Sequence, residues 1–127
     1  MRGSCLCGAV KYQIDGGLRP IVGCHCTQCR KTSGHYVAAT QALSADLRID
    51  GVSNLSWYQS SESAKRGFCK TCGSQLFWTE FSSAYISIMA GTIDGETGLV
   101  MNKQIHSELK GDYYSLPNVE TVNQTTL

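Results

Sequence analysis

Every cysteine of this chain belongs to one of three clusters, and cysteine thiolates are strong zinc ligands. The chain has 127 residues, of which seven are cysteines. The segment Cys69-Lys70-Thr71-Cys72-Gly73 is typical of a zinc knuckle, a tight turn that presents two thiolates to one metal. A pair further upstream adds two more sulfurs, and the glycines on either side of it permit the necessary bend. We therefore expect one structural zinc, closed by Cys5, Cys7, Cys69 and Cys72.

The outer pairs have other possible explanations. A Cys-x-x-Cys pair can be a redox pair, or two cysteines can simply be unrelated buried thiols. A thioredoxin-type redox site needs a βαβ pattern, which this sequence lacks. We therefore expect the outer pairs to bind zinc.

The segment Cys24-His25-Cys26-Thr27-Gln28-Cys29 supplies three sulfurs for a second metal. Structural zinc sites are closed by four protein ligands, whereas catalytic sites keep three and leave one position exchangeable. His25 or His35 could close the site, but His25 sits between two ligands and its ring should point away. His35 follows Gly34 and could swing back. We favour an open, catalytic zinc held by Cys24, Cys26 and Cys29.

A zinc ion with three thiolate ligands favours an incoming thiol over the generation of hydroxide. Coordination deprotonates such a thiol, which could then attack a small aldehyde. Arg30 and Lys31 directly follow the trio and could attract the carboxylates of a thiol-bearing substrate, or they could be solvated charges on a helix. The aldehyde oxygen needs a proton donor, for which His35, Lys31 and Arg30 are the candidates.

The elements that must position these residues are mostly short strands. Apolar and polar residues alternate over residues 9–14, and further strands are predicted at 36–40, 47–49, 55–58, 75–78, 85–89 and 104–107. One short helix is predicted over 27–32, with Thr27 as its N-cap. The pattern indicates a mainly β fold, a single zinc-binding domain of short antiparallel sheets over residues 1–117. Residues 118–127 are polar and are expected to form a flexible tail.

Net charge, the length of apolar runs and the clustering of cysteines indicate which classes of partner to expect. The formal net charge is +1, which provides no basic field for nucleic acid. No apolar run approaches the roughly 20 residues of a membrane span, and the N-terminal residues lack a signal peptide's apolar core. Clustered cysteines without a secretion signal indicate metal chemistry in a reducing compartment, so we expect a cytoplasmic protein with small-molecule partners and no membrane.

The order of three motifs resembles the glutathione-dependent formaldehyde-activating enzyme family, which also contains centromere protein V. The motifs are Cys5-Leu6-Cys7-Gly8, the run from Cys24 to Gly34, and Phe68-Cys69-Lys70-Thr71-Cys72-Gly73-Ser74, followed by Gly91-Thr92-Ile93-Asp94. The resemblance implies a tent-like β fold with two zinc ions, a structural one at the outer pairs and a catalytic one at the trio. It also implies glutathione as co-substrate. Where the family commonly has Ala-Pro-Trp after a lysine, this chain has Gly111-Asp112-Tyr113.

The resemblance implies a zinc-dependent carbon–sulfur lyase that joins glutathione and formaldehyde as S-hydroxymethylglutathione, or acts on another thiol–aldehyde adduct. The alternative is a non-catalytic zinc scaffold that binds a protein or nucleic acid, against which the absence of a basic arm counts. A methionine sulfoxide reductase would need a spare nucleophilic cysteine, and all seven are assigned to clusters.

Overall fold

The computed structural model describes residues 1–122, and strands are its main regular structure. The mainly β prediction is confirmed. Its one α-helix is α1 (Thr27–Ser33), and short 3-10 turns cover Ser44–Asp46, Val52–Asn54, Ala90–Thr92 and Ser107–Leu109. The strands are β1 (Arg2–Ser4), β2 (Lys11–Ile14), β3 (Ile21–Cys24), β4 (Val37–Leu43), β5 (Leu47–Asp50), β6 (Leu55–Gln59), β7 (Ala64–Cys69), β8 (Gln75–Glu80), β9 (Tyr85–Met89), β10 (Met101–Ile105) and β11 (Glu120–Val122).

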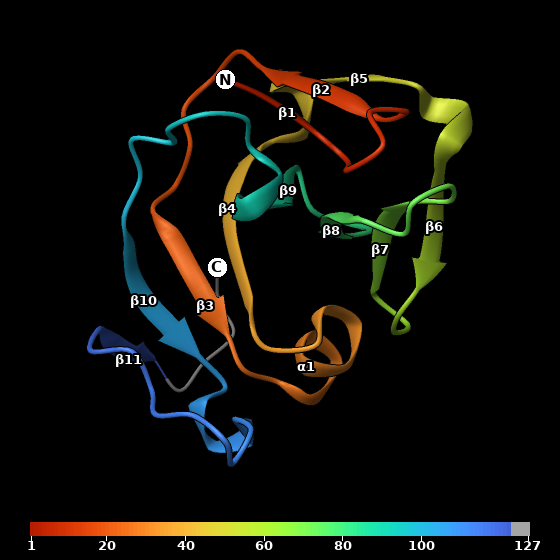
Figure 1. The fold of residues 1–127 in the computed structure, drawn as a ribbon. Coiled ribbons are helices and arrows are strands. Elements are labelled where there is room, and N and C mark those ends of the chain that lie inside the picture. Colours follow the sequence, from red (N-terminus) through yellow and green to blue (C-terminus); the bar gives the residue numbers. More distant parts are fainter. Residues whose placement is uncertain (123–127) are drawn as a thin grey trace.

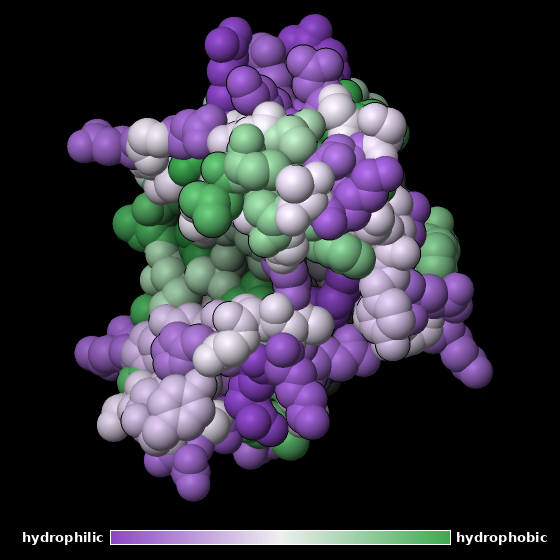
Figure 2. Space-filling model, turned by 45° about the vertical axis from the view of Figure 1, so that its right-hand side comes forward, coloured by the Kyte–Doolittle hydropathy of each residue, from purple (hydrophilic) through white to green (hydrophobic). Residues whose placement is uncertain are grey.

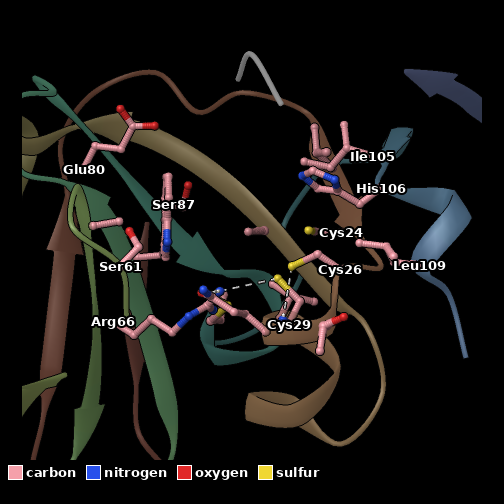
Figure 3. A pocket seen from close by; sticks show the side chains of 18 of the residues that line it. Cys24, Cys26, Cys29, Ser61, Arg66, Glu80, Ser87, Ile105, His106 and Leu109 are labelled. Carbon is pink, nitrogen blue, oxygen red and sulfur yellow. Dashed lines mark hydrogen bonds between the residues drawn. The ribbon is translucent and has the colours of Figure 1, made fainter. Parts of the chain in front are cut away.

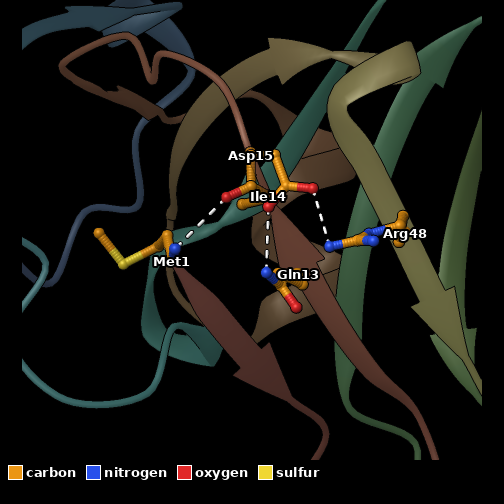
Figure 4. A network of polar contacts seen from close by, with 5 residues as sticks. All are labelled: Met1, Gln13, Ile14, Asp15 and Arg48. Atoms are coloured by element: carbon orange, nitrogen blue, oxygen red, sulfur yellow. Dashed lines mark hydrogen bonds and ion pairs between the residues drawn. The ribbon is translucent and has the colours of Figure 1, made fainter.

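The first cysteine pair lies in the connection between β1 and β2 of the smaller of two sheets. The order of this sheet is β1-β2-β5, and both pairings are antiparallel. Polar contacts tie its edges, as Figure 4 shows: the Met1 amine donates to the carbonyl of Ile14 over 3.3 Å, and Arg48 pairs with Asp15 over 2.9 Å. This sheet holds the turn at Cys5 and Cys7 in place.

The larger sheet has eight strands in the order β11-β10-β3-β4-β9-β8-β7-β6. Its pairings are antiparallel except for two: β10 runs parallel to both β3 and β11. In Figure 1 the sheet forms an arch, with β10 and β3 at one side, β7 and β6 at the other, and α1 between the two sides. The arch gives the sheet two very different faces.

Side chains alternate across a strand, so each face collects every second residue. One face carries Phe77, Ile86 and Ile88, which pack with Tyr12 of the small sheet in the main hydrophobic core. The rings of Tyr12 and Phe77 meet edge to face, with centroids 5.4 Å apart. The opposite, inner face of the arch lines the cavity described below.

Several details differ from the sequence-based expectations. The helix cap is Cys26, not Thr27, because the Cys26 sulfur accepts a hydrogen bond from the Cys29 amide. The helix ends at Ser33, one residue beyond the predicted span of 27–32, and Gly34 caps it in the left-handed conformation with φ of 82°. Strand β7 is not predicted from the sequence, because the adjacent charges at Lys65 and Arg66 and the glycine at Gly67 hide the alternation.

The predicted boundary at residue 117 falls inside paired structure. Residues 120–122 form β11 against β10, and Gln104 donates from its side-chain amide to the carbonyls of Pro117 and Val119. A polar composition therefore does not prevent this segment from pairing through its backbone. The rest of the expected tail, residues 123–127, lies outside the described residues. Within the described residues, no helix is long and apolar enough to cross a membrane.

Candidate active site

The four-cysteine cluster brings together sulfurs from two segments about 60 residues apart in the sequence. The Sγ atom of Cys7 lies 3.7 Å from that of Cys5 and 3.7 Å from that of Cys69, and all four sulfurs lie within 4.8 Å of one another. Four sulfurs at 2.3 Å from a tetrahedral zinc would be roughly 3.8 Å apart. The donor set of Cys5, Cys7, Cys69 and Cys72 therefore fits one metal ion.

Hydrogen bonds reach several of these sulfurs, and those to Cys69 and Cys72 lower the pKa of both thiols. Asn54 donates from Nδ2 to the Cys69 sulfur over 3.0 Å, and the Val10 amide donates to Cys5 over 3.3 Å. A hydrogen bond with the Ser74 hydroxyl, at 3.2 Å, lowers the pKa of Cys72 to about 5. Deprotonated sulfur is the form that binds a metal.

The trio is assembled where β3 passes into α1. Cys24 ends β3, Cys26 caps the helix, and Cys29 lies in its first turn. The three sulfurs lie within 4.8 Å of one another, and Cys29 is buried at 6% exposure. The thiols of Cys24 and Cys29 hydrogen-bond to Cys26 and lower its pKa to about 2, while the same contact raises the pKa of Cys24. Negative charge thus gathers on one sulfur of a compact cup that could hold a metal ion.

His25 turns its ring away from the trio, as expected from its place in the sequence. The ring is fully buried, with Nδ1 2.6 Å from the hydroxyl of Tyr114 and Nε2 2.9 Å from Oε1 of Gln104. Because that amide oxygen can only accept, Nε2 carries the proton and donates. Burial lowers the pKa of His25, which keeps the ring neutral. The residue anchors the turn between β3 and α1 to Gln104 of β10 and is not available as a ligand.

The trio faces a cavity of about 430 Å³, which lies on the inner face of the arch. On the face shown in Figure 2, hydrophobic residues gather around a hollow. Most of the cavity wall is apolar, formed by Val22, Val37, Ala39, Trp78, Met89, Ile105 and Leu109. The volume is within the usual range for a site that binds a small molecule.

Polar side chains enter this cavity from several strands, as Figure 3 shows. Arg66 of β7 is buried, and its Nη2 donates to the sulfur of Cys29 at 3.7 Å and to Oε1 of Gln28 at 3.3 Å. His106 lies near the trio and is 3.8 Å from Glu108. Arg19, Ser87 and Glu80 are among the other polar residues of the lining.

The positively charged residues and the histidine predicted from the sequence lie elsewhere. Arg30, Lys31 and His35 do not line this cavity. His35 is exposed, and its Nδ1 lies 2.9 Å from the hydroxyl of Tyr113. Their roles in binding or proton transfer therefore gain no support from this geometry.

Two cavity residues, Arg66 and His106, escaped the sequence-based reasoning. Ala64 and Arg66 are two residues apart, so in a strand they share a face, and the small apolar Ala64 is the one signal that this face is buried. Nothing in the sequence around His106 indicates its position. It is the single non-glycine residue with positive φ, 54°, within the described chain.

Comparison with known proteins agrees with the motif order and the two cysteine clusters. A family model described as glutathione-dependent formaldehyde-activating enzyme matches residues 1–108. The chain belongs to this family. The match ends before Gly111-Asp112-Tyr113, the segment at which the chain departs from the common family sequence.

Two curated relatives resemble this member of the family. A Halomonas elongata protein, whose name assigns it provisionally to the same enzyme, is 30% identical over 100 residues, 68% of this chain. The matched part spans 64% of that protein, less than two thirds of its length. A Schizosaccharomyces pombe protein named as an uncharacterized lyase is 31% identical over 121 residues, 91% of this chain and 85% of its own. These names support an enzyme of the lyase type.

One solved structure shares the fold. A Rhodobacter sphaeroides protein superposes with a TM-score of 0.66 at 30% sequence identity. The match covers 80% of this chain and 98% of that one. The arched sheet is therefore found in another protein of similar sequence.

Proposed function

We propose that the protein is a zinc-dependent carbon–sulfur lyase that interconverts a thiol and a small aldehyde with their S-hydroxyalkyl adduct. Glutathione and formaldehyde are the pair that the family description supports. The observation that carries the proposal is that Cys24, Cys26 and Cys29 line the cavity, whereas no member of the four-cysteine cluster does.

Ligand count separates the two clusters. Four thiolates complete the coordination of a tetrahedral zinc, so Cys5, Cys7, Cys69 and Cys72 are assigned a structural ion. Three thiolates leave one position, and here the three border a space that can admit a small molecule. All-sulfur donor sets favour zinc over magnesium, calcium or manganese. Zinc in the trio would lower the pKa of a substrate thiol.

The protein's own side chains support the remaining steps. In the forward reaction a carbon–sulfur bond forms, the thiol proton leaves the sulfur, and the aldehyde oxygen gains a proton. Arg66, at 3.7 Å from Cys29, balances negative charge on the cup. His106 is the histidine that lines the cavity, so we assign it the transfer of the proton to and from the aldehyde oxygen. The apolar wall limits the access of water to the adduct.

Exchange spectroscopy by NMR tests this proposal, because it measures interconversion between formaldehyde and its glutathione adduct at equilibrium. We expect an exchange rate above that of the enzyme-free mixture, and a return to that background in Cys26→Ser. Arg48→Gln, on the small sheet and away from the cavity, is a matched control that should keep the full rate. A wild-type rate equal to that of the enzyme-free mixture would rule out the formaldehyde reaction.

A further inference from the structure

The cavity contains three polar groups whose hydrogen-bonding capacity is not used within the described chain. They are Nε of Arg66, Oγ of Ser87 and Nη1 of Arg19. Arg66 is 6% exposed and Ser87 is 4% exposed, and all three residues line the cavity. Buried polar groups nearly always have partners, because an unpaired one costs free energy. Three in one cavity indicate that a ligand supplies the missing partner.

Strand register places these groups along one row of the inner face. Arg66 pairs with Trp78, Trp78 pairs with Ser87, and Ser87 pairs with Gln41. Directly paired residues point to the same face, with Cβ atoms roughly 5 Å apart. Arg19 joins the far end of the row, because its backbone amide donates to the carbonyl of Gln41 over 3.0 Å. Ser87 thus lies in the middle of the row, one residue (Trp78) away from Arg66 on one side and one residue (Gln41) away from Arg19 on the other.

The charge in this row is not neutralised by the protein. No carboxylate lies within ion-pair distance of Arg66 or Arg19 in the described part of the chain. Glu80 borders the same cavity, but its side chain is exposed at the rim. The hydrogen bond from Arg66 to the Cys29 sulfur uses only the Nη2 atom of the guanidinium. Figure 3 shows Ser87 on the same side of the cavity as Arg66.

Guanidinium and hydroxyl donors without a local acid are suited to a carboxylate, which accepts several hydrogen bonds in one plane. The neighbouring wall is apolar, with Val22, Ala39 and Met89 among its residues. A ligand that pairs with these donors and also covers the apolar wall carries a carboxylate and an aliphatic segment. A fully polar ligand would leave the apolar wall without a partner.

We propose that Arg66, Ser87 and Arg19 form a carboxylate subsite, and that the cavity takes a carboxylate-bearing ligand with an aliphatic body. The proposal deepens the function proposed above. It rests on that function only for the identity of the natural ligand, which would be the substrate thiol or its aldehyde adduct. Substrate selection then depends on the spacing between the carboxylate and the sulfur. Arg66 links the two ends, because it contacts Cys29 and belongs to the subsite.

Calorimetric titration with hexanoate, and with 1-hexanol as its neutral counterpart, tests the subsite directly. We expect hexanoate to bind at least about tenfold more tightly than hexanol. Arg66→Gln and Arg19→Gln should each lower hexanoate affinity by about tenfold and leave hexanol affinity within about twofold. Ser87→Ala, which changes little volume, should lower hexanoate affinity by about threefold. Arg48→Gln is the control for loss of a positive charge outside the cavity.

Hexanoate contains neither thiol nor aldehyde, so its binding does not depend on lyase activity. Arg19→Gln leaves the contact between Arg66 and Cys29 intact and therefore separates anion binding from effects on the trio. Equal affinity for hexanoate and hexanol, or hexanoate binding unchanged in both arginine variants, would overturn the subsite. An inactive protein that still binds hexanoate through these arginines would instead contradict only the proposed function.

Discussion

The guanidinium of Arg66 lies 3.7 Å from the sulfur of Cys29, across 37 residues of sequence. This contact joins strand β7, on one side of the arch, to helix α1, which lies between the two sides and carries Cys29. It places a buried positive charge against a cluster of thiols. The chemistry proposed for the trio therefore depends on a residue from a distant strand.

Replacing Arg66 by glutamine should weaken zinc binding at the trio. Loss of the positive charge makes the thiolate form of Cys29 less favourable. Mutation of a residue that contacts a metal ligand, rather than the metal itself, typically changes metal affinity by about 10–100-fold. Competition with a chromophoric chelator measures the affinity, and Arg48→Gln serves as the charge-matched control. Unchanged zinc affinity in Arg66→Gln would show that the contact has no influence on the metal.

His25→Phe should destabilise the fold by about 2–4 kcal/mol, because both hydrogen-bond partners of the ring lose it and one of them, on Gln104, is fully buried. Those partners are the Gln104 amide oxygen and the Tyr114 hydroxyl. Tyr114→Phe removes one of the two hydrogen bonds and should cost less, about 1 kcal/mol. Urea denaturation of the zinc-loaded proteins measures both effects. A loss below about 0.5 kcal/mol for His25→Phe would contradict the anchoring role.

Gly51→Ala should be destabilising by at least about 2 kcal/mol. Gly51 has φ of +80°, and an added Cβ would lie 1.9 Å from the carbonyl oxygen of Ala9. Ala9 belongs to the segment between Cys7 and β2, so the substitution disturbs the first cysteine pair as well. Gly17→Ala is the matched control, because nothing lies within 4 Å of its added Cβ. Equal thermal stability of the two variants would be inconsistent with this close approach.

The two metal ions should leave at different rates. Zinc bound by three thiolates beside a cavity should pass to a chelator before zinc bound by four. We expect two kinetic phases of zinc release, with near-ultraviolet circular dichroism lost mainly in the second. Release of both ions in one phase, together with the fold, would argue against a distinct open site.

Sequence periodicity predicted the strands that alternate clearly, such as β2 and β9, and the cysteine spacing predicted both clusters that the structure brings together. Strand β7 escaped because Gly67 interrupts its pattern. Strand β11 escaped because its polar residues pair through the backbone.

The cavity residues could not be predicted, since they depend on which strands become neighbours. Arg66, Trp78 and Ser87 meet only because β7, β8 and β9 are adjacent in the sheet. His106 reaches the trio because β10 runs parallel to β3, a pairing with no local sequence signal. Arg30 and Lys31, by contrast, are close to the trio in sequence, but in helix α1 neither side chain lines the cavity.

Zinc content combined with titration of free thiols tests the central claim most directly. We predict two zinc ions per chain and no reactive thiol in the wild-type protein. Cys26→Ser should stay folded with one zinc ion, because the four-cysteine cluster is unaffected. One zinc ion per wild-type chain, with three thiols free to react, would contradict a metal site at Cys24, Cys26 and Cys29.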